Sequence, residues 1–192
     1  MNMILTVTAN PLIDRSLLVH SLRLKQVHRA AATFEVAGGK GINVTRMIQT
    51  LGHPVHALTF IGGGYGDHLK ELLELEGIPN TTIRTLSPTR FQVSILDIKK
   101  ETHTDILDPS PIVSRKEMDT MVYEIESILK SSTPVQWVIL SGSGPRGKTR
   151  HLYYDIIKLC NKYNIKTLLD SYGNIVKQGL KAKPYSIKPN LA

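Results

Sequence analysis

The sequence predicts an α/β fold in which a parallel sheet is covered by helices on both faces and a small antiparallel sheet projects as a separate flap. Two superposed patterns support this prediction. Fully apolar segments of strand length alternate with amphipathic helical segments, which is typical of parallel strands joined by helices. Half-polar strand segments also follow one another without intervening helices, at about residues 15–35 and 90–107, and these would form the flap.

The first half of the chain contains both patterns. Asn10-Pro11 ends the first β-rich segment, and Gly52 and Gly77 follow the apolar stripes of two helices. In chain order we expect strands at Met3–Ala9, Leu17–Val19 and Val27–Phe34, a helix at Lys40–Leu51, a strand at Val55–Ile61, a helix at Asp67–Leu75, and strands at Thr82–Thr85, Phe91–Ile98 and His103–Leu107.

The second half alternates more regularly between helix and strand. Ser114, with Glu117 three residues later, has the pattern of a capping box and starts a long helix. There is no internal repeat and no low-complexity linker, so residues 1–192 are expected to form a single domain. The remaining elements are expected at Val135–Leu140 (strand), Thr149–Tyr163 (helix), Lys166–Leu169 (strand), Ile175–Leu180 (helix) and Tyr185–Ile187 (strand).

The composition is ordinary for a globular protein and argues against several classes. Hydrophobic residues make up 41% of the 192 residues and charged residues 21%. No apolar run approaches the roughly 20 residues of a membrane helix, and the first residues lack the basic region of a signal peptide. The single cysteine gives no disulfide framework, and the seven histidines are too dispersed for a metal site. We therefore expect a cytoplasmic protein with no membrane partner.

The formal net charge of +8 suits an anionic partner. However, the basic residues are scattered, and the nearest to a run is the segment from Lys177 to Lys188 with its four lysines. Aromatic residues do not interleave with them as a platform for single-stranded nucleic acid requires. We therefore interpret most of this charge as solvated surface, with attraction of phosphorylated metabolites as the functional alternative and no nucleic-acid partner.

The segment Gly38-Gly39-Lys40-Gly41 joins an expected strand to an expected helix. Glycines let the backbone approach a ligand closely, while the helix N-terminus offers free N–H groups and Lys40 adds a positive charge. The segment is not a Walker A loop, because no Ser or Thr follows the lysine and the upstream glycine is absent. This pattern predicts a site for a phosphate or a polyhydroxylated ligand.

Asp14 follows the first strand, and ligands of open parallel sheets bind outside the carboxyl ends of the strands. With Asn43 entering from the next helix, its carboxylate could accept hydrogen bonds from vicinal hydroxyls. Arg90 is a candidate phosphate clamp, because a guanidinium pairs bidentately with phosphate oxygens. Arg29, on the other expected flap strand, is a similar candidate, and Lys188 and Asn190 lie just past the last strand.

A second glycine pattern supports an alternative function. Gly142, Gly144 and Gly147 fit the G-x-G-x-x-G fingerprint between a strand and a helix, and Asp170 closes the next strand where a ribose-binding acid would lie. Against this interpretation, Pro145 restricts the tight turn and two polar residues precede the helical stripe. An NAD(P)-dependent oxidoreductase is the alternative enzyme class.

In their order along the chain, the segments TVTANPLID, AGGKGINV, SGSGP, LLDSYG and IKPN resemble the PfkB (ribokinase-like) carbohydrate kinases. Within this family they are similar to the branch of 1-phosphofructokinase and tagatose-6-phosphate kinase. The resemblance covers essentially the whole chain, and the glycine-lysine-glycine-x-asparagine segment is its most specific element. It implies a three-layer ribokinase-like α/β domain with a β-sheet lid, in agreement with the two patterns above.

The resemblance also implies roles for individual residues. Asp14, Gly38, Gly39 and Asn43 would contact the sugar, and Ser141 would line its pocket. The substrate's existing phosphate would be held by Lys40 and Arg90, with Arg29 from the lid. Lys188 and Asn190 would face the nucleotide, which is ATP with Mg²⁺ in this family.

The chain departs from the family pattern in its last part. The acidic residue that follows the Lys-Pro-Asn segment and helps to organise magnesium is absent, as is the glycine-rich segment that carries the anion hole and the base. The resemblance therefore implies a C-terminally truncated, incomplete domain without its catalytic residues. Phosphoryl transfer depends on positioning and charge neutralisation, so such a chain would have little activity alone.

These observations lead to three hypotheses about function. In the first, the ancestral activity is ATP-dependent phosphorylation of a ketohexose phosphate to the bisphosphate. In the second, the chain is a non-catalytic phosphosugar-binding remnant, or half of a split kinase that pairs with a separate C-terminal chain. In the third, it is an NAD(P)-dependent oxidoreductase. The exposed edges of the lid strands also favour a homodimer.

Overall fold

A six-stranded parallel sheet forms the centre of the structure, a computed structural model that describes residues 2–147 and 151–188. Its first strand, β1, lies between β4 and β8, with Ile4 opposite both Val55 and Trp137. The strand order is β10-β9-β8-β1-β4-β5, with bounds β1 (Met3–Thr8), β4 (Val55–Ile61), β5 (Asn80–Arg84), β8 (Val135–Ser141), β9 (Lys166–Asp170) and β10 (Ser186–Ile187).

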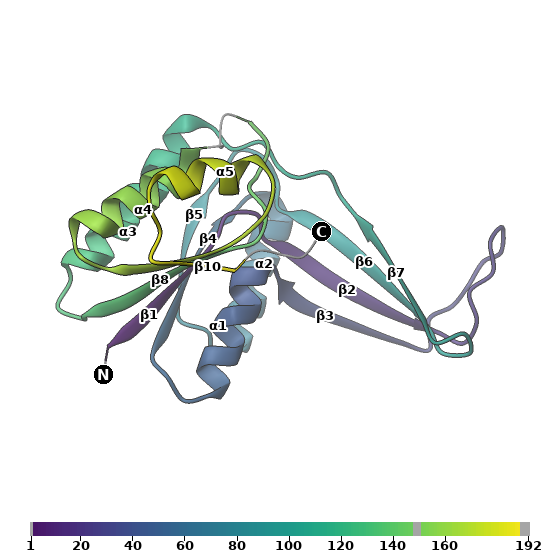
Figure 1. The fold of residues 1–192 in the computed structure, drawn as a ribbon. Helices are drawn as coiled ribbons and strands as arrows, with labels where there is room; N and C mark the ends of the chain where they lie inside the picture. Colours follow the sequence, from purple (N-terminus) through teal and green to yellow (C-terminus); the bar gives the residue numbers. More distant parts are fainter. Residues whose placement is uncertain (1, 148–150, 189–192) are drawn as a thin grey trace.

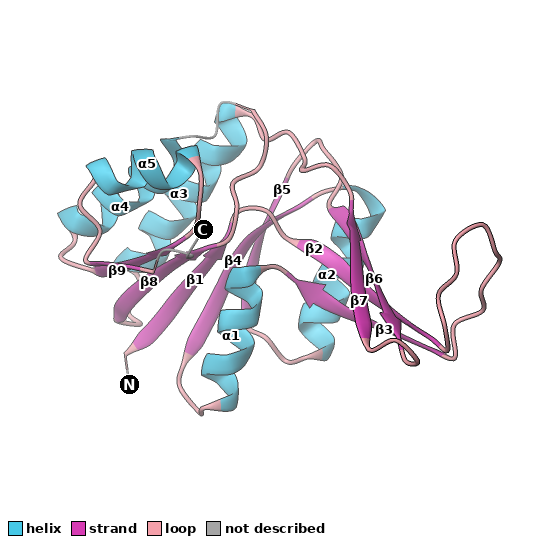
Figure 2. Ribbon diagram, turned by 45° about the vertical axis from the view of Figure 1, so that its right-hand side comes forward, coloured by secondary structure: helices cyan, strands magenta, loops and turns pink. Residues whose placement is uncertain are grey.

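Helices cover both faces of this sheet, which confirms the expected three-layer arrangement (Figures 1 and 2). The helices α1 (Lys40–Thr50) and α2 (Gly63–Leu75) lie on one face. The other face is covered by α3 (Arg115–Lys130), α4 (Leu152–Lys162) and α5 (Asn174–Lys181). Ser114 forms the predicted capping box with Glu117 at the start of α3. Among the described residues, no helix has the length and apolar character needed to cross a membrane.

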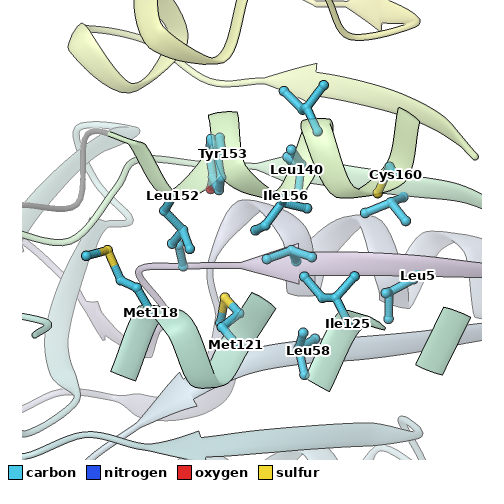
Figure 3. Close-up of a cluster of buried hydrophobic side chains, with 14 of the residues drawn as sticks. Leu5, Leu58, Met118, Met121, Ile125, Leu140, Leu152, Tyr153, Ile156 and Cys160 are labelled. Atoms are coloured by element: carbon cyan, nitrogen blue, oxygen red, sulfur yellow. The ribbon is translucent and has the colours of Figure 1, made fainter. Parts of the chain in front are cut away.

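The larger hydrophobic core lies between the sheet and α3, α4 and α5 (Figure 3). Alternate residues of β1 point into it, so Leu5 and Val7 are fully buried there, whereas Thr6 faces α1 and hydrogen bonds to Thr45. Cys160 belongs to this core, and burial raises the pKa of its thiol to about 12. A smaller core, which includes Ile13, Ile42 and Leu69, packs beneath α1 and α2.

A four-stranded flap projects from the edge of the central domain (Figure 1). Its order is β3-β2-β6-β7, with bounds β2 (Leu12–Val19), β3 (Ala32–Gly38), β6 (Arg90–Asp97) and β7 (Thr102–Leu107). The outer pairs are antiparallel, as expected, but the central pair of β2 and β6 is parallel. The flap is therefore a mixed sheet, because β2 and β6 each enter it directly from the same end of the central domain.

Three elements, β2, β3 and α2, begin four or more residues away from their predicted starts. β2 begins at Leu12 rather than Leu17, because hydrogen bonding to both β3 and β6 holds Asp14 in an extended strand despite its low strand propensity. β3 begins at Ala32, which leaves Arg29 in the loop before it. α2 begins at Gly63 in a glycine-rich stretch, where a Cβ on Gly66 would lie only 3.0 Å from the Ile61 backbone.

Candidate functional site

A cavity of about 300 Å³ opens between the carboxyl ends of the central strands and the flap. Five of the residues that the sequence predicted for substrate binding line it, from the flap, the glycine loop and α1. The arrangement follows from the topology, since β1 and β8 end where β2, β6 and α1 begin. These five residues are Asp14, Gly39, Lys40, Asn43 and Arg90.

Asp14 lies in β2, where the flap forms the wall of the cavity. Its Oδ1 accepts a hydrogen bond of 3.0 Å from Ser94 Oγ, which is also 2.8 Å from Asp105 Oδ1. Because an ionised carboxylate only accepts hydrogen bonds, Asp14 offers its remaining acceptor capacity to donors in the cavity, such as hydroxyl groups.

Lys40 begins α1 and extends toward a buried carboxylate at the end of β9. Its Nζ lies 3.0 Å from Asp170 Oδ1, and Lys188 Nζ lies 3.6 Å from the same oxygen. Asp170 is only 6% exposed. Asp170 therefore holds two ammonium groups close together at this end of the site, and ammonium groups attract phosphate.

Two glycine loops approach each other at the cavity. Gly39 has a φ of 122°, and a Cβ there would lie 2.8 Å from Thr8 Cγ2. Gly142, with a φ of 93°, lies so close to Lys40 that an added Cβ would be 3.4 Å from its Cβ. Both backbone conformations disfavour other residues. The glycines therefore allow the SGSGP loop and the GGKG loop to form one continuous wall.

Arg90 begins β6 and is largely withdrawn from solvent. Its Nη2 donates to the carbonyl of Asn10 over 3.1 Å, while Nε is buried without a hydrogen-bond partner in the described residues. Burial lowers the pKa of Arg90 below its usual value, but a guanidinium stays charged at neutral pH. The guanidinium is therefore held by one hydrogen bond from Nη2, and its other N–H groups are able to donate to a ligand in the cavity.

Within the described part of the chain, the buried side-chain atoms that lack a partner gather at this end of the sheet. They are Thr8 Oγ1, Asn10 Oδ1, Arg90 Nε and Ser141 Oγ. Buried polar groups are nearly always hydrogen bonded. A cluster of exceptions next to one cavity fits a site built for a polar ligand.

The other predicted residues lie around or away from the cavity. Gly38 precedes Gly39 in the same turn, and Ser141 ends β8 as the first residue of the SGSGP segment. Arg29 is exposed in the loop between β2 and β3 and does not line the cavity. Lys188 reaches the site only through Asp170. Asn190 lies outside the described residues.

Several residues of the cavity were not predicted as site residues from the sequence. Asn10 spans two loops, since its Nδ2 donates to Ser110 Oγ over 2.9 Å and to Ser143 Oγ over 3.0 Å. Gln92 and Tyr172 also line the cavity. Asn10 and Tyr172 lie within motifs that the sequence analysis quoted, whereas Gln92 has no local signal, because strand pairing across the flap brings it there.

The loop with the dinucleotide-like glycine pattern is tied to the segment before α3. Arg146 N donates to the Pro111 carbonyl over 2.8 Å, and Val113 N donates to the Arg146 carbonyl over 3.1 Å. The acid of that pattern, Asp170, is engaged by Lys40 and Lys188. The oxidoreductase alternative stays a prediction, for which NAD(P) binding is the direct test.

The described residues contain no group of three or more histidine, cysteine, aspartate or glutamate side chains that could hold a metal ion. The polar side chains at the cavity are instead one carboxylate, three amides, three hydroxyls, and the cations Lys40 and Arg90. This set of donors and acceptors is suited to hydroxyl and phosphate groups rather than to direct coordination of a cation.

An ion pair ties the flap to α2 and is expected to respond to pH. His68 Nε2 lies 2.9 Å from Glu35 Oε2 on β3, and Arg15 also contacts Glu35. The hydrogen bond with Glu35 raises the pKa of His68 above 6.5, and the bond with His68 lowers the pKa of Glu35 below 4.5. The pair is therefore fully charged between these two values. Its contribution is lost as pH rises through the raised pKa of His68, or falls through the lowered pKa of Glu35.

At pH 5.5, we expect the β3 amides to exchange their hydrogens faster in the His68→Gln variant than in the wild type. At pH 8.5, we expect the two proteins to exchange at the same rate. Comparing the two proteins at the same pH removes the intrinsic pH dependence of exchange. His53→Gln, which changes an exposed histidine, serves as the control. An NMR titration that places the pKa of His68 at or below 6.5 would contradict this prediction.

Comparisons with known proteins identify relatives of the whole chain. The model of the pfkB family of carbohydrate kinases matches residues 3–192. A tagatose-6-phosphate kinase from Staphylococcus epidermidis is 34% identical over 191 residues, which cover 98% of this chain and 60% of that protein.

Two solved structures are similar over 98% of the chain. A "Possible 1-phosphofructokinase" from Thermotoga maritima has a TM-score of 0.89 at 27% identity, with 60% of that chain covered. The tetrameric inhibited form of phosphofructokinase-2 from Escherichia coli has a TM-score of 0.88 at 26% identity, with 61% covered. The chain thus spans about 60% of the length of these relatives.

Proposed function

This chain belongs to the pfkB family of carbohydrate kinases, and from that membership we propose that it forms the sugar-phosphate site of a kinase that transfers a phosphoryl group from ATP to a ketohexose phosphate. The acceptor is of the tagatose 6-phosphate or fructose 1-phosphate type, and the product is the bisphosphate. One observation carries the proposal: Asp14, Gly39, Lys40, Asn43 and Arg90 line a single cavity.

Each of these side chains has a role in positioning the acceptor. The Asp14 carboxylate accepts hydrogen bonds from sugar hydroxyls, and the Asn43 amide contacts the sugar beside it. Arg90 binds the phosphate that the sugar already carries, since its free nitrogens match phosphate oxygens. Lys40 neutralises charge between this phosphate and the incoming one. Holding the acceptor in a fixed orientation supplies a large part of the rate in phosphoryl transfer.

In the reaction, a bond forms between the acceptor hydroxyl oxygen and the γ-phosphorus of ATP, and the bond from that phosphorus to the bridging oxygen of ADP breaks. The hydroxyl proton must pass to a base. The family resemblance places this base in a glycine-rich segment that the sequence 1–192 does not contain. We therefore propose that the chain alone binds phosphosugar but transfers phosphoryl groups slowly.

The nucleotide is proposed to approach from the side of Lys188 and Asn190. Lys188 fits this role, because it lies with Lys40 beside Asp170 and ammonium groups attract the phosphates of ATP. Mg²⁺ would be held mainly by those phosphates and by water, as is usual for this ion.

Two non-catalytic alternatives share the same sugar site. The chain could serve as a phosphosugar-binding protein, or it could pair with a separate chain that supplies the base. A homodimer through the flap is a further proposal, supported by the exposed edge strand β7, whose residues are all solvent-exposed.

Ligand-induced stabilisation of the purified chain tests the proposal. Tagatose 6-phosphate or fructose 1-phosphate at about 100 times its dissociation constant should add about 2.7 kcal/mol to the stability of the folded state. Unphosphorylated tagatose is the matched control, and fructose 6-phosphate, MgATP and NAD(P) complete the set. Stabilisation by NAD(P) alone would replace the kinase proposal with the oxidoreductase. No stabilisation by any phosphosugar would refute it.

A further inference from the structure

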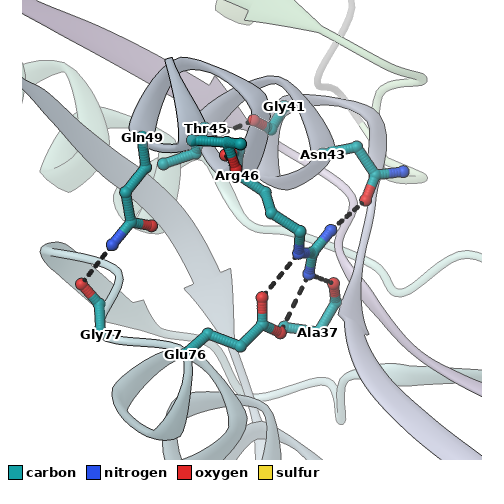
Figure 4. Close-up of polar contacts among 9 residues, drawn as sticks. Ala37, Gly41, Asn43, Thr45, Arg46, Gln49, Glu76 and Gly77 are labelled. Atoms are coloured by element: carbon teal, nitrogen blue, oxygen red, sulfur yellow. Dashed lines mark hydrogen bonds and ion pairs between the residues drawn. The ribbon is translucent and has the colours of Figure 1, made fainter. Parts of the chain in front are cut away.

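Arg46 follows Asn43 on α1, and its guanidinium contacts the Asn43 side chain (Figure 4). Arg46 Nη1 donates to Asn43 Oδ1 over 2.7 Å. The two residues are three positions apart, so they lie on the same face of the helix. Arg46 Nη2 also donates to the carbonyl of Ala37 over 2.8 Å. Ala37 immediately precedes the glycine loop, so one guanidinium contacts both the amide in the cavity wall and the strand that leads into that loop.

Glu76, at the end of α2, holds the guanidinium in place. Arg46 Nε donates to Glu76 Oε2 over 2.6 Å, and Nη2 donates to Glu76 Oε1 over 2.9 Å. Such a bidentate pair fixes the plane of the guanidinium as well as its position. Both side chains are about two-thirds withdrawn from solvent, with 33% and 26% of their surfaces exposed. The Arg46 side chain is therefore oriented before any ligand arrives.

The orientation of Arg46 determines which end of the Asn43 amide faces the cavity. A guanidinium has donors but no acceptor, so it can pair only with the amide oxygen. The amide nitrogen must then point the other way, and Figure 4 shows it directed away from Arg46. Asn43 lines the cavity. It therefore presents hydrogen-bond donors there, while Asp14 on the flap presents acceptors.

We propose that Arg46 is a positioning residue for the phosphosugar site, fixing the Asn43 amide so that its NH₂ group donates to an oxygen of the bound sugar. The inference rests on the proposed function and makes it more specific. Within the one cavity, Asn43 offers donors and Asp14 offers acceptors, and a sugar hydroxyl can pair with either because it both donates and accepts.

A double-mutant cycle in the full chain tests this coupling. Arg46→Met, Asn43→Ala and the double variant are compared for their dissociation constants with tagatose 6-phosphate. Loss of one hydrogen bond should weaken binding about 3- to 10-fold, and the double variant should bind no more weakly than Asn43→Ala alone. Arg46→Lys keeps the positive charge but loses the planar guanidinium with its several N–H donors, so it should behave like Arg46→Met. Arg84→Met, which removes an exposed arginine paired with Asp67, is the control. Losses that multiply in the double variant would overturn the proposal.

A second measurement needs neither a bound ligand nor a folded Arg46→Met variant. In the ligand-free wild type, NMR relaxation of the Asn43 side-chain NH₂ group should report a rigid amide, and Arg46→Lys or Glu76→Gln should make it mobile. A mobile wild-type amide would overturn the proposal whether or not a phosphosugar binds. Conversely, a rigid amide in a chain that binds no phosphosugar would refute the proposed function and leave the contact between Arg46 and Asn43 intact.

Discussion

The free energy of unfolding of the Gly41→Ala variant is expected to be about 2 kcal/mol lower than that of the wild type. The variant is also expected to lose most of its affinity for phosphosugars. Gly41 is buried near the start of α1, and a Cβ there would lie 2.2 Å from Thr8 Oγ1 and 2.9 Å from the Val7 carbonyl oxygen. Alanine is intrinsically better than glycine in a helix by about 1 kcal/mol. The expected loss of stability therefore comes from the clash, which costs more than this gain. Relief requires α1 to move away from β1, and Lys40 and Asn43 would move with it.

Gly64→Ala is the matched control, since Gly64 lies in α2 and a Cβ there would meet nothing within 4 Å. This variant should be as stable as the wild type or slightly more stable. Adding Thr8→Ala to Gly41→Ala removes the hydroxyl but not the backbone contact, so it should restore only part of the stability. Chemical denaturation measures all four proteins. A Gly41→Ala protein as stable as Gly64→Ala would show that α1 and β1 are not in close contact at this point.

Arg90→Gln is expected to weaken binding of tagatose 6-phosphate by about 30-fold or more, because hydrogen bonds to charged groups contribute about 1.5–3 kcal/mol each. The guanidinium is held by the Asn10 carbonyl and already desolvated, so little of its binding energy is spent on ordering it. Arg90→Lys keeps the positive charge but loses the bidentate guanidinium, so its affinity should lie between those of the wild type and Arg90→Gln. Calorimetric titration with tagatose 6-phosphate and with tagatose separates the phosphate contribution from the sugar contribution.

Arg84→Gln provides the control, because Arg84 ends β5, the preceding strand in the chain, and pairs with Asp67 at the surface. It should leave both affinities unchanged. An Arg90→Gln protein whose affinity for tagatose falls as much as that for tagatose 6-phosphate would show that Arg90 shapes the cavity rather than binding phosphate. Thermal unfolding of each variant without ligand checks that the flap is still in place.

Local sequence patterns account for most of the architecture. The alternation of apolar strands and amphipathic helices predicted the parallel sheet with two helical layers, and Ser114 with Glu117 predicted the start of α3. These features depend on neighbouring residues, through the period of the hydrophobic pattern and a single cap. For the same reason the glycine loop was recognisable: the residues that allow a tight strand-to-helix turn are contiguous in the chain.

Pairings between distant segments were decided only by the tertiary structure. Asp14 lies in a strand rather than a turn because β2 pairs with β6, about eighty residues away, and the same pairing makes the flap mixed and brings Gln92 to the cavity. Asp170 meets Lys40 across 130 positions, and Arg46 meets Glu76 across 30. Local patterns and motifs therefore predicted the layers, the glycine loop and five of the residues that line the cavity. The partners that orient those residues depend on strand register and helix packing, which no local pattern encodes.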